Sequence, residues 1–105
     1  MARLVEVALV EALEGKTRAE QLQRLNEWKK QMLAQGAESI TIYEAGAGNI
    51  NANWIFTITH ESAASFGAVL DKYYANPKSY DDLMEVWQKS PVLKFNGYSI
   101  THEIA

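Results

Sequence analysis

Residues 43–65 decide the fold, and they read YEAGAGNINANWIFTITHESAAS. Residues 45–52 are rich in glycine and asparagine, which tolerate the positive φ angles that a loop needs. Residues 53–60 then alternate as a strand does. One face of this strand carries Trp54, Phe56, Ile58 and His60. Because Ser62 follows as the N-cap of a helix, the stretch predicts a hairpin loop, a strand and a helix entry in close succession.

Two helices are indicated by their caps and by apolar stripes. Thr17 and Glu20 have the spacing of a capping box, and Gly36 supplies a left-handed residue that ends the first helix. The second helix begins at Ser62 and ends at Asn76–Pro77, because the residue before a proline is disfavoured in helices. The stripe of the first helix consists of Leu22, Leu25, Trp28, Met32 and Leu33. A shorter helix is expected from Ser79 to Ser90, with Leu83, Val86 and Trp87 facing inward.

Three further strands are expected at residues 3–11, 38–44 and 94–104. The order β-α-β-β-α-(α)-β predicts the split βαβ arrangement of a ferredoxin-like α+β domain, with a four-stranded antiparallel sheet and helices on one face. At 105 residues, the chain 1–105 is expected to form one domain. Strand 54–59 should lie beside the first strand, at or near an edge of the sheet.

The two faces of this sheet are predicted from the alternation. The helix-facing side takes Val5, Val7, Leu9, Ile40, Ile42, Trp54, Phe56, Ile58, Tyr98 and Ile100. The opposite side takes Glu6, Ala8, Val10, Thr41, Tyr43, Ile55, Thr57, Thr59, Ser99, Thr101 and Glu103. A face left to water would carry more Lys and Glu, so a second sheet is expected to cover it.

Nearly the whole chain resembles the dimeric α+β barrel superfamily. The resemblance rests on element order and on a loose pattern of short motifs. These are Tyr43-Glu44-Ala45-Gly46, His60-Glu61-Ser62, Phe66-Gly67-Ala68, Asn76-Pro77 and Trp87. It is strongest to small uncharacterised members and more distant to the stress-responsive, NIPSNAP and antibiotic-biosynthesis monooxygenase branches. The resemblance implies a homodimer that stacks sheet on sheet, and activities that include cofactor-free or haem-linked oxygenases.

Composition excludes several classes of function. The net charge is −3 with interspersed signs, which argues against binding to nucleic acid or to an anionic membrane. The absence of cysteine removes disulfides, thiolate metal sites and a cysteine nucleophile, and suits the cytoplasm. Glu6 and Glu11 interrupt the apolar N-terminal run, which argues against a signal peptide. No metal-ligand spacing or phosphate-binding loop is present, so no cofactor is expected.

His60 and His102 are the only histidines, and each could serve as a base, a haem ligand or a metal ligand. Nothing in their spacing requires a site, so a structural or surface role is the competing interpretation for both. Trp28 and Trp54 are expected in the core. Trp54 and Trp87 are also pocket candidates, and Trp87 could line a pocket mouth.

A small-molecule pocket is the more specific hypothesis for the polar sheet face. A few polar groups among aliphatic ones suit such a pocket, and its further candidates are Asn53, Thr57, Thr59 and Thr101. Glu6 on a central strand would be partly desolvated, which makes it a plausible proton acceptor, and Tyr43 is a further catalytic candidate. The alternative is that this face is only a dimer interface. The sequence thus predicts a small-molecule-binding protein or enzyme, or else a non-catalytic self-association module.

Overall fold

The computed structural model describes residues 2–46, 52–76, 78, 81–82, 85, 88–89 and 91–104. Its elements follow the predicted order. They are β1 (Leu4–Ala12), α1 (Arg18–Ala34), β2 (Ser39–Glu44), β3 (Trp54–His60), α2 (Ala63–Ala75) and β4 (Leu93–His102). The expected short helix places its inward residues at 83, 86 and 87, outside the described residues. No helix of the described part is long and apolar enough to cross a membrane.

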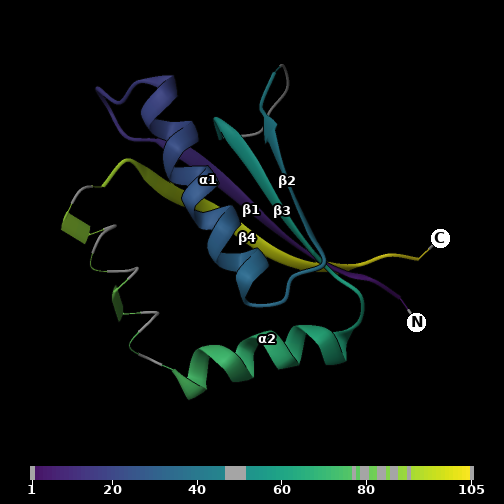
Figure 1. Cartoon of the computed structure of the whole chain (residues 1–105). Coiled ribbons are helices and arrows are strands. Elements are labelled where there is room, and N and C mark those ends of the chain that lie inside the picture. Colours follow the sequence, from purple (N-terminus) through teal and green to yellow (C-terminus); the bar gives the residue numbers. More distant parts are fainter. Residues whose placement is uncertain are drawn as a thin grey trace.

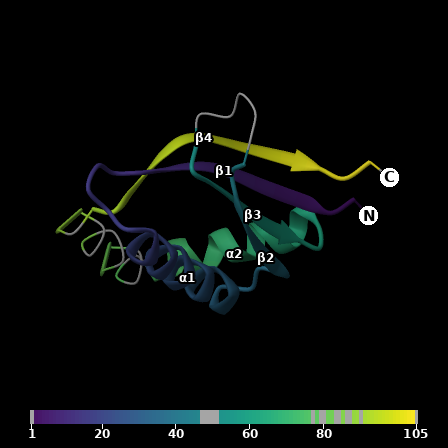
Figure 2. The same cartoon turned by 90° about the horizontal axis from the view of Figure 1, so that it is seen from above.

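The four strands form one antiparallel sheet in the order β2-β3-β1-β4. Strand β3 lies beside β1, as predicted, with β2 outside it at the edge. Helices α1 and α2 lie on the same side of the sheet, and no helix of the described residues covers the other side (Figure 1, Figure 2). This arrangement confirms the ferredoxin-like α+β fold. We call the side without helices the open face.

The predicted caps hold the helices at their starts. Thr17 Oγ1 accepts a hydrogen bond of 3.1 Å from the Glu20 backbone N–H, and its hydroxyl donates to Glu20 Oε1 at 3.2 Å. Ser62 Oγ likewise accepts from the Ser65 N–H at 3.2 Å. Gly36 follows α1 with a φ of 111°, a conformation that side chains other than glycine rarely adopt. These local signals place the helix ends within a residue of the prediction.

The two faces of β1 are the reverse of the predicted ones. Glu6 pairs with Ile58 and Ala8 pairs with Phe56, and directly paired residues point to the same side of a sheet. Glu6, Ala8 and Val10 are therefore buried under the helices, whereas Val5, Val7 and Leu9 lie on the open face. The alternation predicted the wrong face for Glu6, because its carboxylate has polar partners inside the fold. The faces predicted for β2 and β3 are confirmed.

The core lies between the sheet and α1. Phe56 is fully buried and stacks on Trp28 at a centroid distance of 4.0 Å and an interplanar angle of 12°. Leu25 and Met32 of α1 are buried beside them, as the stripe predicts. Leu33 differs, because its side chain is 41% exposed. Helix α2 contributes only Val69 to the fully buried set, so the space beneath α2 is less tightly filled.

Candidate functional site

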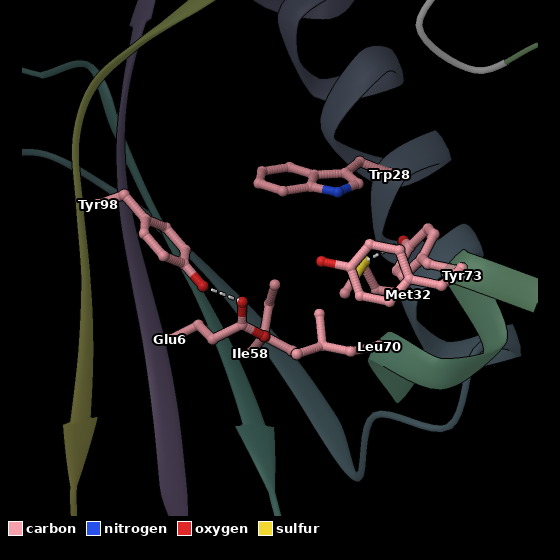
Figure 3. Close-up of a pocket in the computed structure, with 8 residues that line it drawn as sticks. Glu6, Trp28, Met32, Ile58, Leu70, Tyr73 and Tyr98 are labelled. Carbon is pink, nitrogen blue, oxygen red and sulfur yellow. Dashed lines mark hydrogen bonds between the residues drawn. The ribbon is translucent and has the colours of Figure 1, made fainter. Parts of the chain in front are cut away.

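A pocket of about 610 Å³ opens between α1, α2 and the sheet (Figure 3). Among the described residues that line it, one is charged, Glu6 of β1. The other lining residues are aromatic or apolar: Trp28 and Met32 of α1, Ile58 of β3, Leu70, Tyr73 and Tyr74 of α2, and Tyr98 of β4. This composition, with one carboxylate and a few hydroxyl groups among aromatic and apolar walls, is typical of small-molecule sites.

Glu6 is the centre of the site, because both of its carboxylate oxygens have partners. Its Oε2 lies 2.6 Å from His60 Nε2, and the Tyr98 hydroxyl donates to its Oε1. The three residues come from neighbouring strands, since β1 lies between β3 and β4. We call Glu6, His60 and Tyr98 the carboxylate cluster. The residue Glu6 is only 7% exposed, so its carboxylate depends on these donors in place of water.

His60 supports Glu6 from beneath the pocket surface. Its side chain is fully buried, and its ring meets Phe66 edge-on at 4.8 Å. Nδ1 is buried and has no hydrogen-bond partner. A protonated imidazolium would bury an N–H without an acceptor, whereas the neutral form with hydrogen on Nε2 donates to Glu6 and leaves only a lone pair at Nδ1. The geometry thus favours a neutral His60 that donates to a charged Glu6.

Tyr98 forms the side of the cluster that faces the pocket. Its ring is 54% exposed because β4 is an edge strand, while its hydroxyl points to Glu6 (Figure 3). Partial burial, the hydrogen bond to Glu6 and the negative charge of Glu6 raise the pKa of Tyr98 above its ordinary value. Its hydroxyl therefore keeps its proton throughout the neutral range and remains a donor.

This raised pKa predicts a stability difference at alkaline pH. Between the pKa of an unfolded tyrosine, about 10, and that of Tyr98, the native state holds one proton more than the unfolded state. The stabilisation is complete below about pH 10 and is lost as pH rises toward the native pKa. We expect urea unfolding to show a larger loss of stability between about pH 9 and about pH 11 in the parent protein than in Tyr98→Phe. Equal losses in the two proteins would contradict the assigned contact.

The carboxylate cluster brings together two of the four catalytic candidates, Glu6 and His60. Tyr43 lies elsewhere, half exposed on the open face. His102 is exposed near the end of β4 and does not line the pocket. Tyr98 was expected only to face the helices, because the sequence does not reveal its register with Glu6.

The structure places the other described pocket candidates outside this pocket. Thr57, Thr59 and Thr101 lie on the open face, where Thr57 and Thr101 donate hydrogen bonds to backbone carbonyls of Thr41 and Val5. Trp54 is buried in the core, and its Nε1–H donates to Gln21 Oε1 at 2.8 Å.

Asn53 secures the end of the sheet, because its Oδ1 accepts from the Ala12 N–H at 2.7 Å. Trp87 lies outside the described residues. The aromatic lining of the pocket was not recognised as such, since Trp28 and Tyr73 have the helix spacing of ordinary core residues.

The residues of the pocket do not fit a haem bound through histidine. Such a haem needs an imidazole nitrogen that faces the pocket. His60 directs Nε2 to Glu6 and is fully buried, and His102 does not line the pocket. Within the described part of the chain, no group of three or more histidine or acidic side chains could hold a metal ion.

Comparisons with known proteins identify the fold. No protein-family model matches the chain, and no curated protein matches it in sequence. A dimeric ferredoxin-like protein from an uncultured marine organism is similar in structure, with a TM-score of 0.63 and 13% identity over 100% of this chain and 98% of that one. A dabb family protein with a ferredoxin-like fold from Mesorhizobium loti has a TM-score of 0.60 and 11% identity over 100% and 98%.

A dimeric ferredoxin-like protein of unknown function from Thermobifida fusca has a TM-score of 0.59 and 10% identity, over 99% of this chain and 92% of that one. Two of these three neighbours are dimeric ferredoxin-like proteins. At such low identities the likeness carries the fold and no activity. The fold of this chain is therefore the ferredoxin-like fold that these solved structures share.

Proposed function

We propose that this protein binds a small organic molecule in the pocket and moves a proton on it, with Glu6 as the proton acceptor. One observation carries the proposal: a buried carboxylate lines an otherwise apolar pocket and is held there by donors from both neighbouring strands. Burying a charged group costs free energy, and an apolar side chain at this position would fill the space without that cost. Buried ionisable groups in clefts are typical of functional sites.

The roles of the three residues follow from their positions. His60 is a positioning residue, because it holds Glu6 Oε2 from below and does not line the pocket. The other carboxylate oxygen, Glu6 Oε1, lies on the side of Tyr98, and Tyr98 lines the pocket. A substrate C–H or O–H would give its proton to Glu6, while the Tyr98 hydroxyl would turn to donate to the substrate oxygen that gains charge.

The proton balance needs no further reactant. Glu6 takes one proton from the substrate and returns one proton to it, after exchange with solvent where the site admits water, so the net reaction is an isomerisation or a ring closure in which no electron leaves the substrate. A cofactor-free oxygenase would begin with the same proton removal and would then consume O₂ as the oxidant. Oxygen uptake during turnover distinguishes these two outcomes.

Deuterium exchange tests the proposal without knowledge of the natural substrate. The parent protein is incubated in D₂O with a panel of small ketones, β-dicarbonyl compounds and phenols, and the loss of acidic C–H signals is followed by proton NMR. We expect at least one compound that binds the pocket to exchange faster than in buffer. If compounds bind and none exchanges faster, Glu6 is not a catalytic base and the protein is a binding module.

We also propose that a second copy of the chain covers the open face. Val5, Val7, Leu9 and Ile55 lie there among uncharged threonines, and a sheet face with this much apolar surface is normally covered. The dimeric structures with the same fold support this partner. Self-association without a ligand is the alternative function, and it is the conclusion if no compound binds the pocket.

A further inference from the structure

We infer that the ligand of this pocket is an organic cation, an ammonium group that carries an apolar body. The inference rests on the proposal that the pocket binds a small molecule, and it adds the chemical class. Three properties of the pocket lead to it: the charge of its floor, the nature of its walls and the space beyond them.

The floor of the pocket carries a negative charge that no described cation balances. Glu6 is the one charged group among the described lining residues, and its partners His60 and Tyr98 are neutral donors in the geometry above. The described ion pairs of lysine and arginine all involve other carboxylates. A carboxylate removed from water is stabilised by an opposite charge nearby. An ammonium ligand would supply that charge, whereas an anionic ligand would be repelled.

The walls around this carboxylate are aromatic. Trp28, Tyr73, Tyr74 and Tyr98 line the same pocket, and Figure 3 shows the rings of Trp28, Tyr73 and Tyr98 around one space. Trp28 stacks on Phe56 and is thereby fixed in place, and the Tyr73 hydroxyl donates to Met32 Sδ at 2.8 Å. The negative faces of aromatic rings attract cations, and aromatic cages bind alkylated ammonium groups in this way.

The pocket extends beyond the space that an ammonium group needs. About 610 Å³ is in the usual range for sites of small organic ligands. Met32, Ile58 and Leu70 provide apolar surface on the side of the helices. The ligand class is therefore an amine with an aromatic or aliphatic body, which places its charge near Glu6 and its body against these residues.

Two probes of similar shape test the inference, 2-phenylethylammonium and 2-phenylethanol, which differ in charge at about pH 7. Binding to the full-length protein is measured by calorimetry or by NMR titration. We expect the ammonium to bind about tenfold more tightly than the alcohol, as a partly desolvated ion pair with cation–π contacts predicts. Glu6→Gln should remove this preference. Glu11→Gln, the same change at a partly exposed position of β1 outside the pocket, should keep it.

A substitution of Tyr74 is a second test that should not destabilise the fold, because this residue is 78% exposed. Tyr74→Leu should weaken ammonium binding by about twofold to fivefold and leave alcohol binding unchanged, and Tyr74→Phe should restore the ammonium affinity. Equal affinities for the two probes in the parent protein, or no binding of the ammonium, would overturn the inference. Deuterium exchange in the panel above would still support the proposed function in that case. A preference for the ammonium without any exchange would reject only the catalytic role.

Discussion

Glu6→Gln is expected to slow the catalysed deuterium exchange by about 100-fold or more, the usual contribution of a positioned general base. Glutamine has nearly the same size as glutamate, and its carbonyl oxygen can still accept the His60 Nε2–H. Its NH2 group can donate to the Tyr98 hydroxyl oxygen, so no N–H is left buried at His60 Nδ1. The cluster would keep its packing, but an amide cannot take a proton from a substrate. The measurement is the exchange rate of the most reactive compound in the panel.

Two further variants distinguish the loss of the base from the loss of a charge elsewhere and from the loss of a neighbouring donor. Glu11→Gln makes the same change on the same strand, at a residue bound to Asn96 and Lys94 at the surface, and should leave the rate unchanged. Tyr98→Phe removes the donor but keeps the carboxylate, so we expect a partial loss. Circular dichroism and thermal unfolding establish that each variant is folded. A folded Glu6→Gln protein that exchanges at the parent rate would show that Glu6 is not the base.

The elements could be predicted from the sequence because their signals are local. Thr17 and Ser62 accept hydrogen bonds from N–H groups three residues later, so a short segment contains the whole signal. The alternation of residues 54–60 was equally clear, because one face of β3 is buried throughout. Such interactions within a few residues are what sequence patterns record best.

The face of β1 could not be predicted in the same way. Both sides of this strand carry apolar residues, and Glu6 was assigned to the polar side. Its actual position depends on two partners that are 54 and 92 residues away in the sequence. Without those partners a buried glutamate is unfavourable, so the prediction placed Val7 and Leu9 inside instead. The site itself depends on the register of three strands, which no local pattern of this chain specifies.

Val7→Glu is expected to convert the proposed homodimer into a monomer. Val7 lies on the central strand of the open face, opposite Thr57 and Ser99 in the two neighbouring strands. In a sheet-on-sheet dimer its side chain would be enclosed between the two sheets, and a buried unpaired carboxylate there would cost several kcal/mol per protomer. In a monomer the same carboxylate would lie in water beside two hydroxyl groups, so the fold should persist. Light scattering coupled to gel filtration measures the mass directly.

Leu33→Glu is the matched control for this experiment. Leu33 is an apolar residue 41% exposed on α1, on the helical side of the sheet. The same change of charge at that position should leave the dimer intact, because a partner on the open face does not touch it. A parent protein that is monomeric at micromolar concentration, or a Val7→Glu protein that stays dimeric, would contradict the proposed interface. If Val7→Glu is a folded monomer that still binds 2-phenylethylammonium, then one protomer supplies the whole pocket, since Val7 and the carboxylate cluster lie on opposite faces of the sheet.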